Sequence, residues 1–284
     1  MGERDDVTGR LGGRRARRNS RAGARARDRV AEQPPFAQPR LRLEPTRAVS
    51  DDDLEAIHRA SLEVLRTTGI DMLHPGARRL LAAAGAEVDG ERVRFDPALV
   101  ESLLSSAPRQ FTLHGRRPNR DLTIGGDWVT FSSVASAPNI VDRAGGRRAG
   151  SRADYRTLLR LCQMLNIIHT VGGYPVEPID LHASIRHLEA TWDALTIMDK
   201  PFHVYSLGRQ RNLDAIEMVR IARGVSDAEL DEQPSISSII NASSPLRYDH
   251  PMLEGIIELS SRGQVIIITP FTLAGAMAPI TLAG

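Results

Sequence analysis

Apolar residues recur at the three- and four-residue spacing of an amphipathic helix in the stretch that follows Ser50. Ser50 and Asp53 have the spacing of a capping box, and the acidic run that contains Asp53 suits the positive end of a helix dipole. We therefore expect a helix to start at Ser50 and to stop at Gly69. The positions that follow the helical spacing are Leu54, Ile57, His58, Ser61, Leu62 and Leu65.

Two further helices and one hairpin are predicted before residue 110. Pro75 suits the first turn of a helix over residues 77–84, and Asp96-Pro97 opens another that ends at Ser105. Residues 88–95 predict a hairpin around Asp89-Gly90. Residues 48–110 are thus expected to form a small, mostly helical N-terminal region.

Beyond residue 110 the pattern changes to short β-branched runs that alternate with amphipathic helices. Residues 111–114 and 121–124 flank a turn, and strand-like runs then start roughly every 30–40 residues, the length of one βα unit. The predicted strands cover residues 128–131, 167–171, 202–205, 236–240 and 265–268, and the predicted helices cover residues 152–165, 181–198, 212–223 and 251–261.

This alternation predicts an α/β fold. We expect residues 111–284 to form a (β/α)8 barrel of the TIM type that is cut after about five βα units, with the helical N-terminal region as an added layer. A doubly wound open sheet is the alternative. The first βα turn lacks the G-x-G-x-x-G phosphate loop, which weakens the nucleotide-binding version of that alternative.

The last 21 residues, 264–284, contain no charged side chain. Val265 to Ile268 has the character of a strand buried on both faces, which needs a crossover helix and a further strand beside it. We therefore expect the chain to be the front part of a larger protein. Pro270, Gly275 and Pro279 interrupt the apolar stretch, so we expect no membrane span there.

Charge is distributed unevenly along the chain. Residues 1–47 contain 13 arginines and 6 acidic residues, a balance of +7, although the whole chain carries only +2. This segment is predicted to be a disordered Arg-rich tail, either a nucleic-acid or anionic-surface arm or an extension without a role. With 4% aromatic residues, stacking on nucleic acid is not expected.

The single cysteine, Cys162, excludes an internal disulfide and fits a reducing compartment, so a cytoplasmic location is expected.

Small and hydroxyl-bearing residues follow the predicted strands, at the barrel end where such folds carry their chemistry. Carboxylates are few there, since Glu177 and Asp180 lie further out in their loop. Such a surface suits close approach of a large, mostly uncharged partner and suits metal ligation poorly. We single out no catalytic residue and expect no metal site. The candidate lining residues are Gly172, Gly173, Tyr174, Ser206, Gly208, Asn241, Ser243, Ser244, Thr269 and Phe271.

Several of these segments resemble the trimethylamine methyltransferase family. The resemblance runs from about residue 45 to the end of the chain, and its two C-terminal motifs are specific. The matching segments are residues 55–65, Gly69-Ile-Asp, His74-Pro75, residues 107–116, Asp199-Lys200-Pro201-Phe202, Ile239 to Leu246, and Thr269-Pro270 with Ala274 to Gly284.

The resemblance implies a barrel enzyme that moves a methyl group from a methylated amine to the cobalt of a corrinoid. A separate protein carries this corrinoid, and none is bound covalently to the present chain. Some archaeal members hold the amine with pyrrolysine at a position downstream of residue 284. Others lack it and act on quaternary amines such as glycine betaine. The implied partners are a corrinoid-binding protein and a small methylated amine, and a homo-oligomer is left open.

In such an enzyme, aromatic faces would hold the methylammonium group, and Tyr174, Phe271 and Phe131 are the candidates. Asn241, Ser243, Ser244 and Thr269 are the expected polar lining. Alternatives that the sequence leaves open are a truncated, inactive remnant and an interaction module without catalytic activity.

Overall fold

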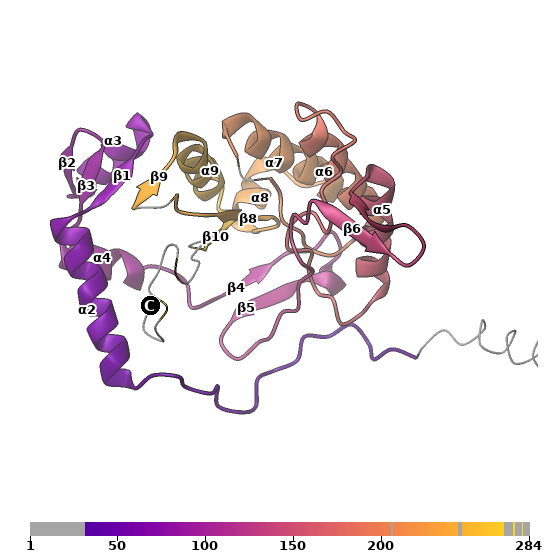
Figure 1. Cartoon of the computed structure of the whole chain (residues 1–284), viewed down its shortest axis with the longest axis horizontal. Helices are drawn as coiled ribbons and strands as arrows, with labels where there is room; N and C mark the ends of the chain where they lie inside the picture. Colours follow the sequence, from indigo (N-terminus) through magenta and orange to yellow (C-terminus); the bar gives the residue numbers. More distant parts are fainter. Residues whose placement is uncertain (1–31, 206, 244–245, 270–274, 276–279, 281–284) are drawn as a thin grey trace, which may run out of the picture. The chain divides into compact units, whose positions relative to one another are not determined.

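The computed structural model describes residues 32–205, 207–243, 246–269, 275 and 280 (Figure 1). The chain divides into two units, residues 1–35 and 36–284, and the helices and strands below all belong to the second. That unit is mixed α/β, as predicted. Among the described helices, none combines the length and apolar character that a bilayer span requires.

The N-terminal helices start where the sequence predicts. In α2 (Asp51–Thr67), the Ser50 hydroxyl accepts a hydrogen bond from the Asp53 N–H, and the Asp53 carboxylate accepts one from the Ser50 N–H. α3 (Pro75–Ala83) is capped by the His74 ring, and α4 (Pro97–Ser105) by Asp96. These caps satisfy backbone donors that a helix start would otherwise leave unpaired.

A four-stranded mixed sheet joins these helices, in the order β2-β3-β1-β9. β2 (Glu87–Asp89) and β3 (Arg92–Arg94) form the predicted hairpin. β1 (Ile70–Met72) pairs antiparallel with β3 and parallel with β9 (Arg247–Tyr248). The sequence did not predict β1 or β9, because such short strands show no periodicity and these two, unlike β2 and β3, flank no hairpin turn. The three predicted helices are thus accompanied by a small sheet, which a segment beyond residue 240 completes.

Two antiparallel hairpins follow. β4 (Gln110–Leu113) and β5 (Leu122–Gly125) flank a 3-10 turn, as predicted, whereas β6 (Asn139–Asp142) and β7 (Gly146–Ala149) were not predicted. The segment around Gln38, inside the predicted tail, lies along β5: its amide donates to the Thr123 carbonyl at 3.0 Å and accepts from the Thr123 N–H at 2.7 Å.

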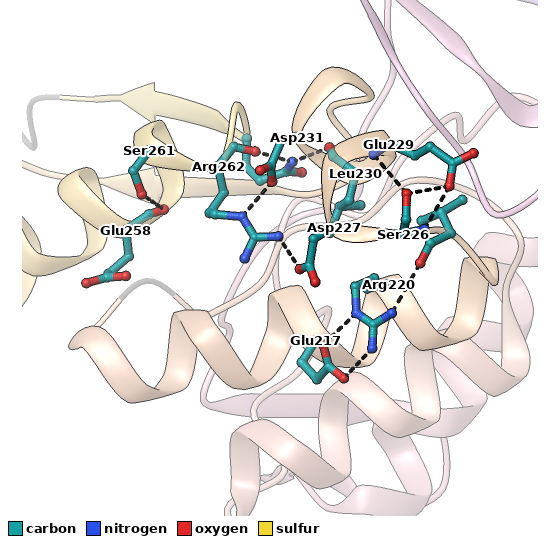
Figure 2. A network of polar contacts seen from close by, with 12 residues as sticks. Glu217, Arg220, Ser226, Asp227, Glu229, Leu230, Asp231, Glu258, Ser261 and Arg262 are labelled. Atoms are coloured by element: carbon teal, nitrogen blue, oxygen red, sulfur yellow. Dashed lines mark hydrogen bonds and ion pairs between the residues drawn. The ribbon is translucent and has the colours of Figure 1, made fainter.

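Four longer helices pack in chain order, α5 on α6, α6 on α7 and α7 on α9 (Figure 1). α6 starts later than predicted, at Arg186 instead of residue 181. The short α8 was not predicted, and Arg262 holds it through ion pairs to Asp227 at 2.6 Å and Asp231 at 2.5 Å (Figure 2). The helices are α5 (Arg152–Met164), α6 (Arg186–Ile197), α7 (Arg209–Arg223), α8 (Asp227–Glu232) and α9 (His250–Ser261).

In the described residues, parallel pairings connect neighbouring segments in the order of the chain. β8 (Ser237–Ile240) pairs with β10 (Val265–Ile268) over four residues. The three predicted strands before β8 take part only through isolated bridges, not through continuous ladders. These bridges join Ser132 to Thr170, Val171 to Phe202, and His203 to Ser237.

Asp193 and Lys200 are two of the polar groups that are buried in the described part of the chain, where the main apolar cluster involves α5, α6 and α7. Asp193 of α6 is fully buried and forms ion pairs with Arg152 and Arg156 of α5. Lys200, 2% exposed, donates hydrogen bonds from Nζ to the carbonyl oxygens of Cys162 (2.6 Å), Leu165 (2.9 Å) and Ile168 (2.7 Å). The ammonium thus satisfies carbonyls at the C-terminal end of α5, where a positive charge also suits the helix dipole.

Candidate functional site

Gly172 and Gly173 pack against the loop after the first predicted strand. A Cβ at Gly172 would lie 2.6 Å from the Ser132 hydroxyl and 2.7 Å from the Ser133 carbonyl oxygen. Gly173 has a φ of +141° and would bring its Cβ to 2.8 Å from the Ala135 side chain. The missing side chains therefore make room for residues 132–135, a packing role that the sequence did not distinguish from open space for a partner.

Gly208, in contrast, borders open space. It caps the start of α7 with a φ of +83°, a conformation that favours glycine. The nearest atom to a Cβ there would be a Glu254 carboxylate oxygen at 3.8 Å. Its N–H donates to the Pro251 carbonyl at 3.1 Å, which fixes the start of α7 against α9.

Asn241 and Thr269 meet at the carboxyl ends of two neighbouring parallel strands. Asn241 follows β8 and Thr269 follows β10, and the Thr269 hydroxyl donates to the Asn241 side-chain oxygen. Both are half-buried, as is Ser243, whose carbonyl accepts from the Arg247 N–H at 3.1 Å. The structure thus brings two of the predicted polar residues into direct contact.

Tyr174 is buried within a group of three tyrosines. Its ring lies edge-on to Tyr155 at 5.5 Å and stacked with Tyr205 at 6.0 Å between centroids. Its hydroxyl is buried without a hydrogen-bond partner among the described residues. Burial, and then the nearby Glu177 carboxylate, raises the pKa of Tyr174, so the hydroxyl stays protonated and can donate at neutral pH.

The Tyr174 ring borders a small recess that is open to solvent, which we call the tyrosine recess. Glu177 pairs there with Arg186 at 3.3 Å. The Arg211 guanidinium lies over the Tyr205 ring, 5.0 Å from its centroid. The lining residues are Tyr174, Glu177, Ala183, Arg186, His187, Tyr205 and Arg211.

An aspartate–histidine pair borders the recess through His187. His187 Nε2 is 2.8 Å from Asp214 Oδ2, and His187 Nδ1 is buried without a partner among the described residues. Burial acts to raise the pKa of Asp214, but hydrogen bonds from His187 and Gln210 outweigh it, and the pKa falls below its usual value. Asp214 therefore stays ionised and orients the His187 ring.

Other candidate residues lie apart from the recess or outside the described part. Phe131 is 44% exposed and stacks on the buried His169 ring at 5.9 Å. Ser206, Ser244 and Phe271 lie outside the described residues. The sequence missed Tyr205, Arg211 and the His187–Asp214 pair as site residues, because these residues converge only through packing of α6 and α7.

Three groups able to hold a metal ion also come together, although the sequence led us to expect none. His74, His250 and Glu254 offer ligand atoms that all lie within 4.8 Å of one another. His182 does not belong to this group, and its Nδ1 lies 2.7 Å from the Ser184 hydroxyl.

Comparison with known proteins places these features in a family context. A family model described as Trimethylamine methyltransferase (MTTB) matches residues 10–284. The chain is 34% identical over 236 residues to a glycine betaine methyltransferase of Desulfitobacterium hafniense (strain Y51), a match that covers 83% of this chain and 49% of the relative.

Two trimethylamine methyltransferases are also similar. One, MttB of Desulfitobacterium hafniense (strain DSM 10664 / DCB-2), is 30% identical over 240 residues, or 83% of this chain and 48% of the relative. The other, MttB of Methanosarcina thermophila, is 24% identical over 242 residues, or 83% of this chain and 50% of the relative. The chain spans about half the length of the curated relatives that it matches.

Proposed function

Since the chain belongs to the trimethylamine methyltransferase family, we propose that it takes part in moving a methyl group from a small methylated amine to a corrinoid carried on a separate protein. The observation that carries this proposal at the level of the site is the contact between Asn241 and Thr269. It joins polar side chains at the carboxyl ends of adjacent parallel strands, where barrel enzymes bind their substrates.

The proposed architecture is the first part of a (β/α)8 barrel. The parallel neighbours follow one another in chain order, from Ser132 through β8 to β10, without the reversal that defines a doubly wound sheet. α5, α6, α7 and α9 lie between successive segments of this series, as crossover helices do. Both observations support a barrel over an open sheet.

The tyrosine recess is the proposed amine-binding site. A methylammonium group would take the place over the Tyr205 ring that the Arg211 guanidinium now occupies, and the Glu177 carboxylate adds a negative charge to the recess. Arg211 would repel a simple ammonium ion but would pair with a carboxylate. We therefore favour glycine betaine, which carries both charges, over trimethylamine as the amine that this chain binds.

The strand-end residues suit a corrinoid only in part. Gly172 and Gly173 leave no open space, whereas Gly208 does, and Asn241 and Thr269 offer half-buried polar groups to a docked ring. When it is docked, a reduced corrinoid supplies the nucleophile that accepts the methyl group.

The chain's own residues then align the reactants and exclude water. Burial and stacking of Tyr174 would fix the orientation of the bound ammonium group, and its protonated hydroxyl would donate to the carboxylate of the amine. His187, oriented by Asp214, would hold a second polar group next to that carboxylate.

Product analysis tests this proposal. The chain is incubated with glycine betaine and reduced cobalamin, and dimethylglycine is measured by NMR. A Thr269→Val variant should form it more slowly, and a variant at exposed Ser260, Ser260→Ala, should match the unmodified chain. The absence, above a protein-free control, of both dimethylglycine from glycine betaine and dimethylamine from trimethylamine would contradict methyl transfer by this chain.

A second candidate function is that of an interaction module. An apolar groove lies between α3 and α9 and reaches Ile268, which is 59% exposed at the end of β10. An exposed apolar edge of this kind favours association. Sedimentation and thermal denaturation would separate the two candidates. A chain that sediments as a soluble monomer and also melts cooperatively would contradict the interaction module.

A further inference from the structure

Three potential metal ligands converge where the N-terminal region meets α9. His74 is the residue that caps α3, whereas His250 and Glu254 lie four residues apart at the start of α9 and so face the same side of that helix. The His74 and His250 rings are 4.4 Å apart between centroids. Packing of β1 on β9 brings these distant parts of the sequence together.

The spacing of two of these ligands already fits a tetrahedral metal ion. His250 Nε2 lies 3.4 Å from Glu254 Oε1, which is long for a hydrogen bond between these groups. A zinc ion bound to both atoms at about 2.0–2.1 Å would separate them by roughly this distance in tetrahedral geometry. The ion can therefore enter without a large movement of α9.

The second oxygen of the carboxylate has its own partner. Glu254 Oε2 accepts a hydrogen bond from the Arg209 N–H at 3.1 Å, so Oε1 stays directed towards His250. A hydrogen bond to the carboxylate oxygen that does not bind the metal orients the ligand and strengthens metal binding. Arg209 begins α7, and a metal ion would thus connect three helix starts.

We propose that His74, His250 and Glu254 form a three-ligand site for a divalent cation of the zinc class, with one coordination position left open. Two imidazoles and one carboxylate form a common ligand set for zinc. The site does not rest on the proposed methyl transfer, because none of its ligands belongs to the tyrosine recess or to the Asn241–Thr269 pair.

Titratable and charged groups of α3 and α9 face His74. Burial, and then the neighbouring His250, lowers the pKa of His74. Arg78 and Arg79 of α3 act in the same direction on this pKa, and Glu254 opposes them. The two arginines also disfavour a cation nearby, and the Glu254 charge offsets part of that repulsion.

Metal binding has one structural consequence that identifies the site. His74 Nδ1 accepts a hydrogen bond from the Ala77 N–H at 3.0 Å, and a neutral imidazole has only one acceptor nitrogen. If Nδ1 binds the ion, it no longer accepts from the Ala77 N–H. If Nε2 binds the ion, Nδ1 carries the proton and cannot accept either, so Ala77 loses its partner in both cases. The free energy lost with this helix cap is small compared with the free energy of zinc binding, so binding can still occur. The Ala77 amide should therefore exchange its hydrogen faster when zinc is bound.

Calorimetry on the metal-free chain tests the site, with zinc chloride as the probe. We expect saturable binding of one ion, weakened at least about ten-fold in His250→Ala and in Glu254→Gln. Both residues are exposed or half-buried, and glutamine can keep the acceptor for Arg209, so both variants should fold. His182→Ala, an exposed histidine outside the cluster, is the matched control and should bind as the unmodified chain does.

Two further results would overturn the proposal. One is the absence of saturable binding, and the other is binding that His250→Ala and Glu254→Gln leave unchanged or that His182→Ala weakens equally. Hydrogen exchange at Ala77 gives an independent readout. An unchanged exchange rate on addition of zinc would show that His74 is not a ligand.

Discussion

Arg152 holds the carboxylate of Asp193 across the interface of α5 and α6, with Nε 2.8 Å from Oδ2. Arg156 contacts the other oxygen at 2.7 Å, so one fully buried acidic group receives two guanidinium groups. Without Asp193, the two partly exposed guanidinium groups lose the charge-assisted hydrogen bonds that this carboxylate accepts, and bonds to charged groups are the stronger ones.

Replacing Asp193 should therefore destabilise the chain strongly. We expect Asp193→Ala to lower the free energy of unfolding by about 3 kcal/mol, measured by urea denaturation. The exposed pair of Glu217 and Arg220, 2.7 Å apart, is the matched control (Figure 2). Glu217→Ala should change stability by less than about 0.5 kcal/mol. Equal effects of the two substitutions would contradict this account of Asp193.

Stability should rise with pH above about 8 because of Lys200. Burial lowers the pKa of Lys200 in the folded chain to about 8, while the ordinary value is 10.5. Between these values the unfolded chain binds more protons, so a higher pH favours the folded state. Urea denaturation at several pH values from about 7.5 to 9.5 measures this rise together with the opposite effect of Cys162, whose pKa burial raises in the folded chain. The range ends below that of tyrosine ionisation, which also opposes the rise.

The variant Lys200→Met isolates this effect. It removes the titrating group, and we expect the rise between about pH 8 and 9.5 to disappear. It also leaves the carbonyls of Cys162, Leu165 and Ile168 without their donor, which should cost about 2 kcal/mol at pH 7. A pH dependence identical to that of the unmodified chain would assign the rise to other groups.

Arg211 should matter for glycine betaine and not for an amine that lacks a carboxylate. Replacing it with glutamine removes the charge that would pair with the carboxylate, so we expect about ten-fold weaker binding of glycine betaine. Calorimetry with tetramethylammonium should show no loss. The exposed Arg160 lies outside the recess, and Arg160→Gln is the control. A parallel loss for both ligands would show that Arg211 acts through the Tyr205 ring.

Gly172 should not tolerate a side chain. In Gly172→Ala the new Cβ meets the Ser133 carbonyl, a backbone atom that cannot move away cheaply, and we expect a loss of about 2 kcal/mol in thermal or urea denaturation. At Gly145 a Cβ would meet only the Asp142 side chain at 3.1 Å, so Gly145→Ala should be mild. A neutral Gly172→Ala would reopen the interpretation that this glycine leaves room for a partner.

The sequence predicts the elements that depend on local signals. Ser50 with Asp53 and Asp96 with Pro97 are complete within a few residues, and both helix starts are confirmed. The start of α8 shows that such signals can be overlooked, because Ser226 and Glu229 also form a capping box that the sequence contains. β9, in contrast, exists only through its pairing with β1, and no local pattern announces it.

The candidate site divides in the same way. Tyr174, Asn241 and Thr269 follow strands that their β-branched neighbours predict, so position along the chain was enough to select them. Arg211 and His187 lie on helices with ordinary surface patterns, and only the packing of α6 on α7 brings them to Tyr174. The sequence alone also could not tell that Gly172 is required by residues 132–135.

Lys200 is the only lysine of the chain, and its amine is enclosed by α5 and the residues that follow it. Apart from the amino terminus, an acylating reagent therefore has one target, and it reaches that target only when this part of the core opens. The rate of Lys200 acylation should report the free energy of that opening directly. The protein thus carries a built-in, single-site chemical sensor of its own local unfolding.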